Sequence, residues 1–404
     1  MKKRLLCLLL LLTLFMFLVG CTLIEKTEEP IVEINAPDSE TFEKTNGAVG
    51  EGTSIPTEEP VDEAIVEEVE QEESAEVPKC RRQFLPTFSS GPHYIGPLFD
   101  AHFHMPNLID KSKIPEGHGD SYGDDYGNDH GSSVTDPILG KDAELDKILC
   151  NFDNEDVIGV IGFVIGAEEV LGETISKAQS IKTDSSGKVN LFLMPIGFSK
   201  QSLENIEESN KGLFSGYGEI AFYDQRNMNI LPDSQQMIEI YEVAGKNDLI
   251  VMFHPDGRQQ TQVENAIKKN QNVKFLLHGP EAEGYITSLM DKYPNVYYSI
   301  DAVLARIPPA PAALMYMVSG KEEFKLKFDQ NFDLMLDESE KSWKAKIEKY
   351  PNRFMWGTDR GHLWTYDEDV SVLLEEFGRA LIARLDPEVQ EKFAYKNAEN
   401  LLQK

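Results

Sequence analysis

After residue 81 the chain repeats one pattern, in which a short apolar run rich in β-branched and aromatic residues precedes an amphipathic segment. The runs predict eight strands, at residues 97–104, 157–165, 189–196, 217–222, 249–254, 273–278, 296–300 and 354–359. The intervening and closing segments predict helices at about 143–150, 167–181, 201–211, 234–246, 260–269, 281–292, 321–349, 367–383 and 387–402. Strands this continuously apolar need cover on both faces, so the pattern predicts an α/β fold, a (β/α)8 TIM barrel. A doubly wound open sheet is the competing topology.

The first of these runs ends in the sequence Asp-x-His-x-His. Strand alternation predicts that Leu98, Asp100, His102 and His104 share one face. Two imidazoles two residues apart at the end of a strand can both reach a single cation. A motif this short also occurs by chance, so its meaning depends on the rest of the chain.

Polar residues follow other runs at the same point, where the apolar strand gives way to a loop. Glu219 lies in the fourth run, His254 and His278 end the fifth and sixth, and Asp359 ends the eighth. The carboxyl ends of barrel strands meet at one rim, which is where TIM-barrel active sites lie. Four of the eight histidines and two acids from non-adjacent strands therefore indicate an active site and favour the barrel over the open sheet.

These motifs together resemble the amidohydrolase superfamily, and within it the amidohydrolase-related branch. The similarity covers about residues 95–402 and implies a metal-dependent (β/α)8 barrel. It rests on the Asp100-x-His102-x-His104 opening, Gly218-Glu219-Ile220, the strand-end His254 and His278, Gly357-Thr358-Asp359, and the closing Asn397-Ala398-x-x-Leu401.

The resemblance implies that His102, His104, His254 and Asp359 bind a divalent ion, with Zn²⁺ expected. Imidazole and carboxylate ligands suit that ion, and a catalytic site keeps one position for water. The ion lowers the pKa of that water and polarises a substrate carbonyl. Asp359 is then the expected general base.

The same resemblance implies roles for two further residues. His278 would stabilise a developing oxyanion or bind substrate, and in some relatives the corresponding histidine contacts a second metal. Glu219 resembles the strand-four carboxylate that bridges two ions in binuclear relatives. Many such relatives use a carboxylated lysine there, and the fourth run contains none. The sequence therefore leaves open whether the site holds one ion or two.

The expected function is hydrolysis of a C–N or C–O bond, as in an amide, cyclic amide, ester or lactone of a small molecule. A non-oxidative decarboxylase built on the same residues is the alternative, and Glu219 favours hydrolysis because a second carboxylate favours two ions. A non-catalytic binding lipoprotein on the same barrel is a further alternative. The complete ligand set argues against it.

Three charged or titratable residues and one long insertion near the predicted rim each have more than one possible role. Arg258, Arg360 and His362 follow catalytic strand ends and are candidates for binding an anionic group of the substrate, or are rim charges in water. Residues 111–140 form a long insertion rich in Gly and Asp. It is a lid, a Ca²⁺-binding loop or a solvated insertion, and its spacing lacks the full EF-hand pattern.

The N-terminus has the features of a secretory signal. Three basic residues at positions 2–4 precede an apolar run over residues 5–18, which is short for a membrane span. The run is followed by Gly20 and Cys21, an ending that resembles the lipobox of bacterial lipoproteins. Residues 1–20 are therefore expected to be removed and Cys21 lipidated, which places a membrane-anchored protein in the cell envelope, outside the cytoplasm. A plain membrane anchor with Cys21 unmodified is the alternative.

Residues 21–80 predict a disordered acidic linker ahead of a single catalytic domain at 81–404. Between residues 22 and 79 the chain carries 18 acidic residues and 3 lysines, half of its net charge of -30. Such a segment buries too little apolar surface to offset its chain entropy. Its charge argues against nucleic-acid binding and against a polybasic membrane contact.

Two cysteines remain for the domain once Cys7 leaves with the signal and Cys21 takes lipid. An oxidising compartment permits a disulfide between Cys80 and Cys150. The sequence alone does not show that they meet, and a reactive thiol beside a buried one is equally consistent with it.

Overall fold

The computed structural model describes residues 84–88, 91–105, 145–164, 168, 171–223, 230–301, 314–315, 317–360 and 363–403. The predicted signal sequence with Cys21, the acidic linker, Cys80, the insertion at 111–140 and His362 lie outside the described residues. Predictions about those parts of the chain stay predictions.

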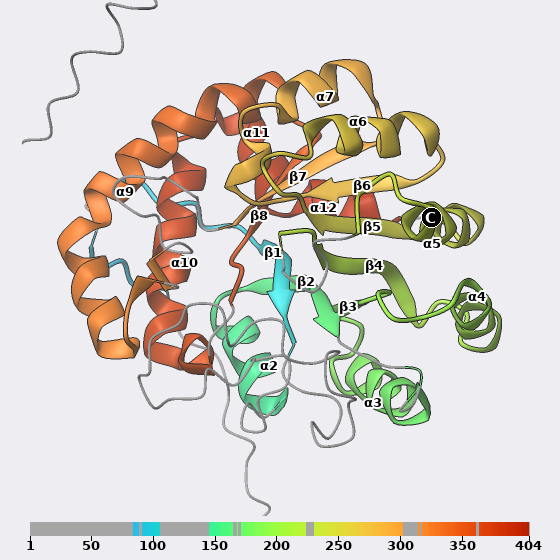
Figure 1. Cartoon of the computed structure of the whole chain (residues 1–404). Coiled ribbons are helices and arrows are strands. Elements are labelled where there is room, and N and C mark those ends of the chain that lie inside the picture. Colours follow the sequence, from blue (N-terminus) through green and yellow to red (C-terminus); the bar gives the residue numbers. More distant parts are fainter. Residues whose placement is uncertain are drawn as a thin grey trace, which may run out of the picture. The chain divides into compact units, whose positions relative to one another are not determined.

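Among the described residues, eight parallel strands form one sheet in the order β1 to β8, with helices between them (Figure 1). A parallel bridge between Phe103 and Arg360 joins the first strand to the chain just after the last, so the sheet is a nearly closed barrel. This confirms the predicted (β/α)8 fold. The strands are β1 Leu98–His104, β2 Val157–Val164, β3 Val189–Leu193, β4 Phe214–Ala221, β5 Ile250–His254, β6 Lys274–Leu277, β7 Val296–Asp301 and β8 Phe354–Gly357.

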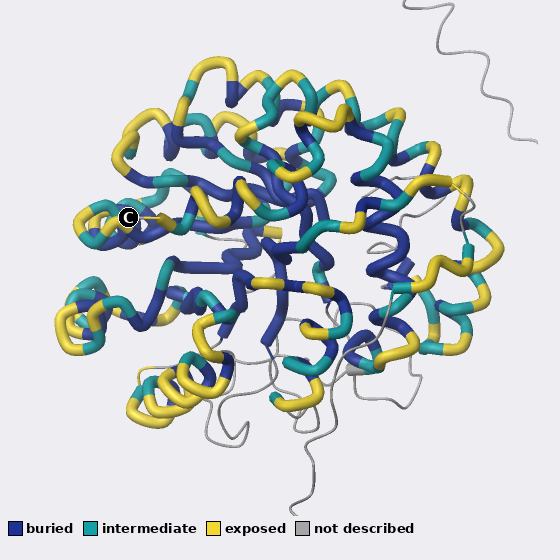
Figure 2. Tube along the Cα trace, turned by 180° about the vertical axis from the view of Figure 1, so that it is seen from behind, coloured by how far each residue is buried: buried dark blue, intermediate teal, exposed yellow. Residues whose placement is uncertain are grey.

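Helices surround this sheet, and their exposed residues lie on the outside of the molecule (Figure 2). No helix within the described ranges combines the length and apolarity needed to cross a membrane. The α-helices are α2 Leu145–Asn154, α3 Leu171–Asp184, α4 Lys200–Ser209, α5 Gln235–Lys246, α6 Gln260–Lys269, α7 Ile286–Lys292, α9 Lys321–Lys349, α10 Glu368–Ala383, α11 Pro387–Glu391 and α12 Asn397–Leu402. Shorter turns are the 3₁₀-helices η4 Pro280–Ala282 and η5 Leu363–Tyr366 and the π-helix η6 Lys392–Lys396.

Two hydrophobic clusters form the core. One contains mainly strand residues and fills the barrel, and the other lies between the strands and the helices. The first strand contributes to both, because Phe99 and Ala101 belong to the inner cluster whereas Leu98 and Phe103 belong to the outer one. The prediction that Leu98 shares a face with His102 and His104 is therefore wrong. The register between β1 and β2 shifts twice, and such an irregularity interrupts the simple alternation of a strand.

The closing helix α12 seals the barrel at the amino ends of the strands. Ala398 and Leu401 pack into the inner cluster. The Asn397 side chain donates hydrogen bonds to the carbonyls of Pro351 (2.9 Å) and Phe354 (2.8 Å), at the start of β8. The final helix is thus part of the barrel core.

A segment preceding β1 is fixed to α10. The backbone N–H groups of Thr87 and Phe88 donate to the buried carboxylate of Glu376, at 2.8 and 2.6 Å. Arg379, also on α10, donates to the carbonyl of Tyr94 at 2.9 Å. The residues from 84 to 96 that the structure describes therefore belong to the folded domain.

Cys150, in α2, is disulfide-bonded. The other three cysteines of the chain lie outside the described residues. The pairing of Cys150 with Cys80 remains a prediction.

Candidate functional site

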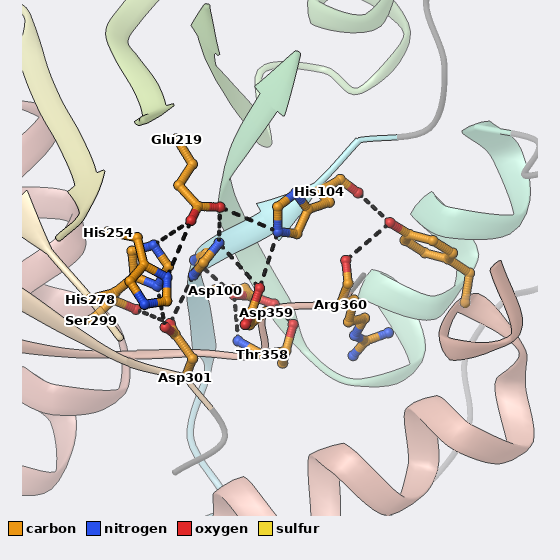
Figure 3. Close-up of polar contacts among 12 residues, drawn as sticks. Asp100, His104, Glu219, His254, His278, Ser299, Asp301, Thr358, Asp359 and Arg360 are labelled. Carbon is orange, nitrogen blue, oxygen red and sulfur yellow. Dashed lines mark hydrogen bonds and ion pairs between the residues drawn. The ribbon is translucent and has the colours of Figure 1, made fainter. Parts of the chain in front are cut away.

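The six residues predicted to form the site converge at the carboxyl ends of the strands (Figure 3). All are buried or nearly so: the side chains of His254 and Asp359 are the most accessible, at 15% and 16% exposure. They are His102 and His104 in β1, Glu219 in β4, His254 at the end of β5, His278 directly after β6 and Asp359 two residues after β8.

Glu219 lies at the centre of this group. Its Oε2 is 3.2 Å from Nε2 of His102 and 3.6 Å from Nε2 of His104. Its Oε1 is 2.7 Å from Nε2 of His278 and 3.6 Å from Nδ1 of His254. Each carboxylate oxygen therefore faces a different pair of imidazoles.

Asp359 stands on the side of the Oε2 pair. Its Oδ1 is 3.1 Å from Nε2 of His104 and 3.4 Å from Nε2 of His102. Its backbone N–H donates to the carbonyl of His102 at 3.0 Å, and its φ of +49° turns the chain sharply as it leaves β8. The carboxylate is thus held beside the His-x-His motif of the opposite end of the chain.

The donor atoms form two clusters that suit a metal ion, each with atoms within 4.8 Å of one another. One cluster comprises His102, His104 and Asp359, and the other His102, Glu219 and His278. Imidazole nitrogens with carboxylate oxygens are the donors that Zn²⁺ takes in catalytic sites. The residues therefore fit a divalent ion, and Glu219 is placed to serve two.

His254 lies elsewhere than the resemblance implied. It was expected beside His102, His104 and Asp359, but it belongs to neither cluster. Its ring packs edge-on against that of His278, with centroids 4.4 Å apart, and its Nδ1 faces the Oε1 atom of Glu219. This arrangement groups His254 with His278.

Asp301, the last residue of β7, is a central member of the site that the sequence analysis missed. Its Oδ1 lies 3.1 Å from Nδ1 of His102, and its Oδ2 lies 2.9 Å from Nδ1 of His278. The hydroxyl of Ser299 donates to Oδ1 at 2.7 Å. An acidic residue at the end of an apolar strand was the available signal, the same one that identified the other site residues.

A second missed carboxylate, Glu281, lies in η4 and contacts His254. Its Oε2 is 2.7 Å from Nε2 of the imidazole. Gly279 makes this close approach feasible, because a Cβ at that position would lie 2.1 Å from the same nitrogen. Gly279 also has a φ of +89°, which other residues rarely adopt.

Asp100, quoted as part of the opening motif, joins the first and last strands. Its buried carboxylate accepts hydrogen bonds from the backbone N–H of His102 and of Thr358, each at 3.0 Å, and from the Thr358 hydroxyl. Burial raises the pKa of Asp100 to about 6, although the positive charge of Arg360 and these hydrogen bonds oppose the shift. Asp100 thus fixes the chain on both sides of the site.

The packing of acids against imidazoles shifts their pKa values in opposite directions. Burial disfavours every charged form, but the charge of His278 and the hydrogen bonds from three imidazoles hold the pKa of Glu219 well below its usual range. Against the same burial, hydrogen bonds with Glu219 and Glu281 raise the pKa of His254 to about 9. The carboxylates of Asp301 and Asp359 likewise hold the pKa of His102 well above its usual value. Without a metal, the site therefore favours ionised carboxylates together with protonated imidazoles at His102 and His254, and a metal bound there would displace protons from these imidazoles.

The two candidate substrate-binding arginines differ in environment. Arg360 is 1% exposed and its guanidinium contacts Glu155 and Ser371, each at 2.7 Å. The structure contradicts a substrate-binding role for Arg360, because its charge is already paired inside the protein. Arg258 is 80% exposed and pairs with Asp256 at 2.7 Å, and its proposed role stays a prediction.

Solved structures that match the chain are distant in sequence. One is a probable 2-pyrone-4,6-dicarboxylic acid hydrolase from Acinetobacter baumannii, at 9% identity and a TM-score of 0.47, with 76% of this chain and 98% of that chain covered. Another is an amidohydrolase from Burkholderia multivorans with bound zinc, at 14% identity and a TM-score of 0.47, with 76% of this chain and 99% of that chain covered. A third is 2,6-dihydroxybenzoate decarboxylase from Rhizobium, at 12% identity and a TM-score of 0.43, with the same coverage of both chains. No curated protein matches the chain.

The sequence model of one family, described as amidohydrolase, matches residues 99–404. This range begins in β1 and includes every site residue from Asp100 to Asp359. Because the match extends over well more than half of the sequence, the chain belongs to the amidohydrolase family.

Proposed function

We propose that the protein is a metal-dependent hydrolase that cleaves a C–N or C–O bond of a small molecule, such as an amide, cyclic amide, ester or lactone. The observation that carries the proposal is the position of Glu219, whose two oxygens face different imidazole pairs while Asp359 adjoins one of them. A site built for a single ion does not need a carboxylate placed between two sets of donors.

In this proposal His102, His104, Asp359 and Glu219 would hold one ion. Glu219 and His278, together with the adjoining His254, would hold a second, weaker one. A bound divalent ion supplies Lewis acidity and lowers the pKa of water at the site. Zn²⁺ is the proposed ion, because the donors are imidazole nitrogens and carboxylate oxygens.

Asp359 is the residue we assign to proton transfer. Its side chain is 16% exposed whereas that of Glu219 is 3% exposed, so Asp359 is the more accessible of the two to a substrate. Its carboxylate accepts a proton from the attacking water and passes it to the leaving group, a role that positioned acids and bases commonly fill. Nε2 of His278 points at Glu219, which favours ligation over the oxyanion-binding role.

Non-oxidative decarboxylation is the second candidate. The same accessible carboxylate of Asp359 supports it, because a protonated Asp359 can deliver its proton to the carbon that loses CO₂. The two reactions differ in what they consume. Hydrolysis incorporates an oxygen atom of water into the product, whereas decarboxylation incorporates only a proton.

We also propose that the enzyme acts outside the cytoplasm, anchored through lipid on Cys21. The support is sequence-based: a basic start, a short apolar run and Gly20 before the cysteine. The acidic residues between positions 22 and 79 then act as the spacer between the anchor and the domain.

The proposal is tested by elemental analysis of the purified protein, combined with an assay panel of esters, lactones, amides and aromatic carboxylic acids. Reactions run in ¹⁸O-labelled water identify a hydrolase by label in the product. Release of CO₂ with no label in the organic product identifies the decarboxylase. A metal-loaded protein that binds panel members and turns over none of them would support a binding lipoprotein instead.

A further inference from the structure

The Asp301 carboxylate is shared between two imidazoles that the proposed function places in different ion sites. Nδ1 of His102 lies 3.1 Å from one oxygen and Nδ1 of His278 lies 2.9 Å from the other. The opposite nitrogens of the same rings face the two oxygens of Glu219, at 3.2 and 2.7 Å. Two carboxylates and two imidazoles thus alternate in a closed ring, most of which is visible in Figure 3.

This closed cycle of contacts specifies which nitrogen of each imidazole carries the proton. A carboxylate accepts hydrogen bonds and donates none, so the hydrogen bond between Asp301 and His278 requires a proton on Nδ1 of His278, and the 3.1 Å contact between Asp301 and His102 favours the same arrangement in His102. With Nδ1 protonated, Nε2 of a neutral imidazole is left with its lone pair directed at the Glu219 side, where a metal would be held. Such outer contacts commonly fix the ring orientation of a ligating histidine.

The Asp301 carboxylate is itself held in place. It is fully buried, and Ser299 donates to its Oδ1 at 2.7 Å. Gly357 on the neighbouring strand leaves room for this pair, because a Cβ there would lie 2.6 Å from the Ser299 hydroxyl and 2.8 Å from Oδ1. The position of one carboxylate is therefore set by β7 and β8, and two imidazoles depend on it.

We infer that Asp301 is a positioning residue that sets both His102 and His278 at once and so couples the affinities of the two ion sites. The inference rests on the proposed metal-dependent function. It predicts a specific asymmetry with Glu281, whose hydrogen bond to the imidazoles of the described site is with His254, at 2.7 Å. Loss of Asp301 affects both ions, whereas loss of Glu281 affects only the ion on the His254 side.

The experiment compares Asp301→Asn with Glu281→Gln in the full chain, since both substitutions keep size and remove charge. An asparagine offers one oxygen and one NH₂ group, so it can accept from only one of the two Nδ1–H groups. Zinc titration against a competing chelator should show both ions weakened, by about 10- to 100-fold, in Asp301→Asn. In Glu281→Gln one ion should weaken and the other keep its wild-type affinity.

A second readout needs no metal. The Nδ1 protons of His102 and His278 should give two protected imidazole resonances in the ¹⁵N-labelled metal-free chain. Both should move in Asp301→Asn and neither in Glu281→Gln. A wild-type chain that binds no zinc would refute the proposed function and the coupling of ion affinities, whereas the two resonances would still decide whether Asp301 positions both imidazoles.

Ser299→Ala covers the case in which Asp301→Asn does not fold. It keeps both imidazole contacts and removes one hydrogen bond from Oδ1, so zinc should weaken more on the His102 side than on the His278 side. Equal effects of Asp301→Asn and Glu281→Gln on a single ion would overturn the inference. So would unchanged imidazole resonances in Asp301→Asn, or unchanged zinc affinity in Ser299→Ala.

Discussion

The backbone N–H of Asp359 donates a hydrogen bond of 3.0 Å to the carbonyl of His102. This contact belongs to the seam between the first strand and the last, and it places the Asp359 carboxylate within 3.4 Å of the His102 ring. Barrel closure and assembly of the site are therefore one structural event. A ligand that binds both residues, as a metal ion would, also stabilises the closed barrel.

Replacing Asp359 with asparagine tests its role in proton transfer. The amide oxygen can still contact a metal, but the side chain can no longer accept a proton, so turnover should fall by about 10²- to 10⁴-fold while part of the metal is retained. Turnover and metal content are measured on the same preparation. Full activity in Asp359→Asn would exclude Asp359 as the base.

Glu219→Gln tests the number of ions. If Glu219 bridges two, an amide cannot serve both sites, and the stoichiometry should fall towards one with sharply reduced turnover. If the site holds one ion, affinity should fall by about 10- to 100-fold at constant stoichiometry.

Glu207→Gln is the matched control for Glu219→Gln. Glu207, in α4, is also buried, and its carboxylate accepts a hydrogen bond of 3.1 Å from Tyr217, which lies in β4 with Glu219. Glu207 belongs to neither donor cluster. It should leave the metal content unchanged. Two equivalents of metal in both the wild type and Glu219→Gln would contradict either version of the Glu219 argument.

Arg360→Met tests the reassignment of that arginine from substrate binding to stability. The substitution leaves the buried Glu155 carboxylate without its partner, and such losses typically cost about 3–5 kcal/mol in the free energy of unfolding. Arg258→Ala removes an exposed pair and should leave the free energy of unfolding almost unchanged. Denaturant unfolding of the two variants measures the difference, and equal stabilities would contradict the burial argument.

Truncation at the N-terminus tests where the domain begins. A chain starting at residue 81 should keep its melting temperature and metal content. A chain starting at residue 97 loses the hydrogen bonds that Thr87 and Phe88 donate to the buried Glu376 carboxylate, at a cost of about 1–3 kcal/mol. Calorimetry should show a lower melting temperature only for the shorter chain, and a loss of stability on starting at residue 81 would mean that the acidic segment packs on the barrel.

Cys21→Ala tests the anchor. The variant should remain unprocessed or be released without lipid, because the modified thiol is absent. Phase partitioning in detergent distinguishes the two proteins, and a variant that partitions with lipid as the wild type does would contradict the lipoprotein proposal.

The fold was predictable because each strand of a covered parallel sheet is a separate apolar run, and all eight runs correspond to strands. Strand ends were less predictable: the third run was expected to reach residue 196, but β3 ends at Leu193, and β4 begins at Phe214, earlier than expected. Apolar residues continue into loops that pack on the core, so composition alone does not show at which residue the hydrogen-bonded pairing between strands ends.

The convergence of the six residues at one rim was predictable from the sequence, and their contacts were not. Asp301 was missed because the seventh run was expected to end at residue 300, whereas β7 includes Asp301. Its contacts with two imidazoles from other strands, 3.1 and 2.9 Å away, are visible only in the structure. Arg360 was misassigned because its partner, Glu155, lies 205 residues earlier in the chain. The sequence alone does not distinguish a charged side chain that is exposed to solvent from one that pairs with a buried counter-ion.

The position of α12 has a consequence for synthesis. His104 is made 255 residues before Asp359, and the helix that seals the barrel follows later still. While the chain is being translated, the first strand has neither its neighbour across the seam nor the Leu401 side chain that completes the inner cluster. The nascent polypeptide therefore cannot close the barrel until α12 has emerged, and the Asp359 carboxylate joins the His-x-His motif only after most of the domain has been made.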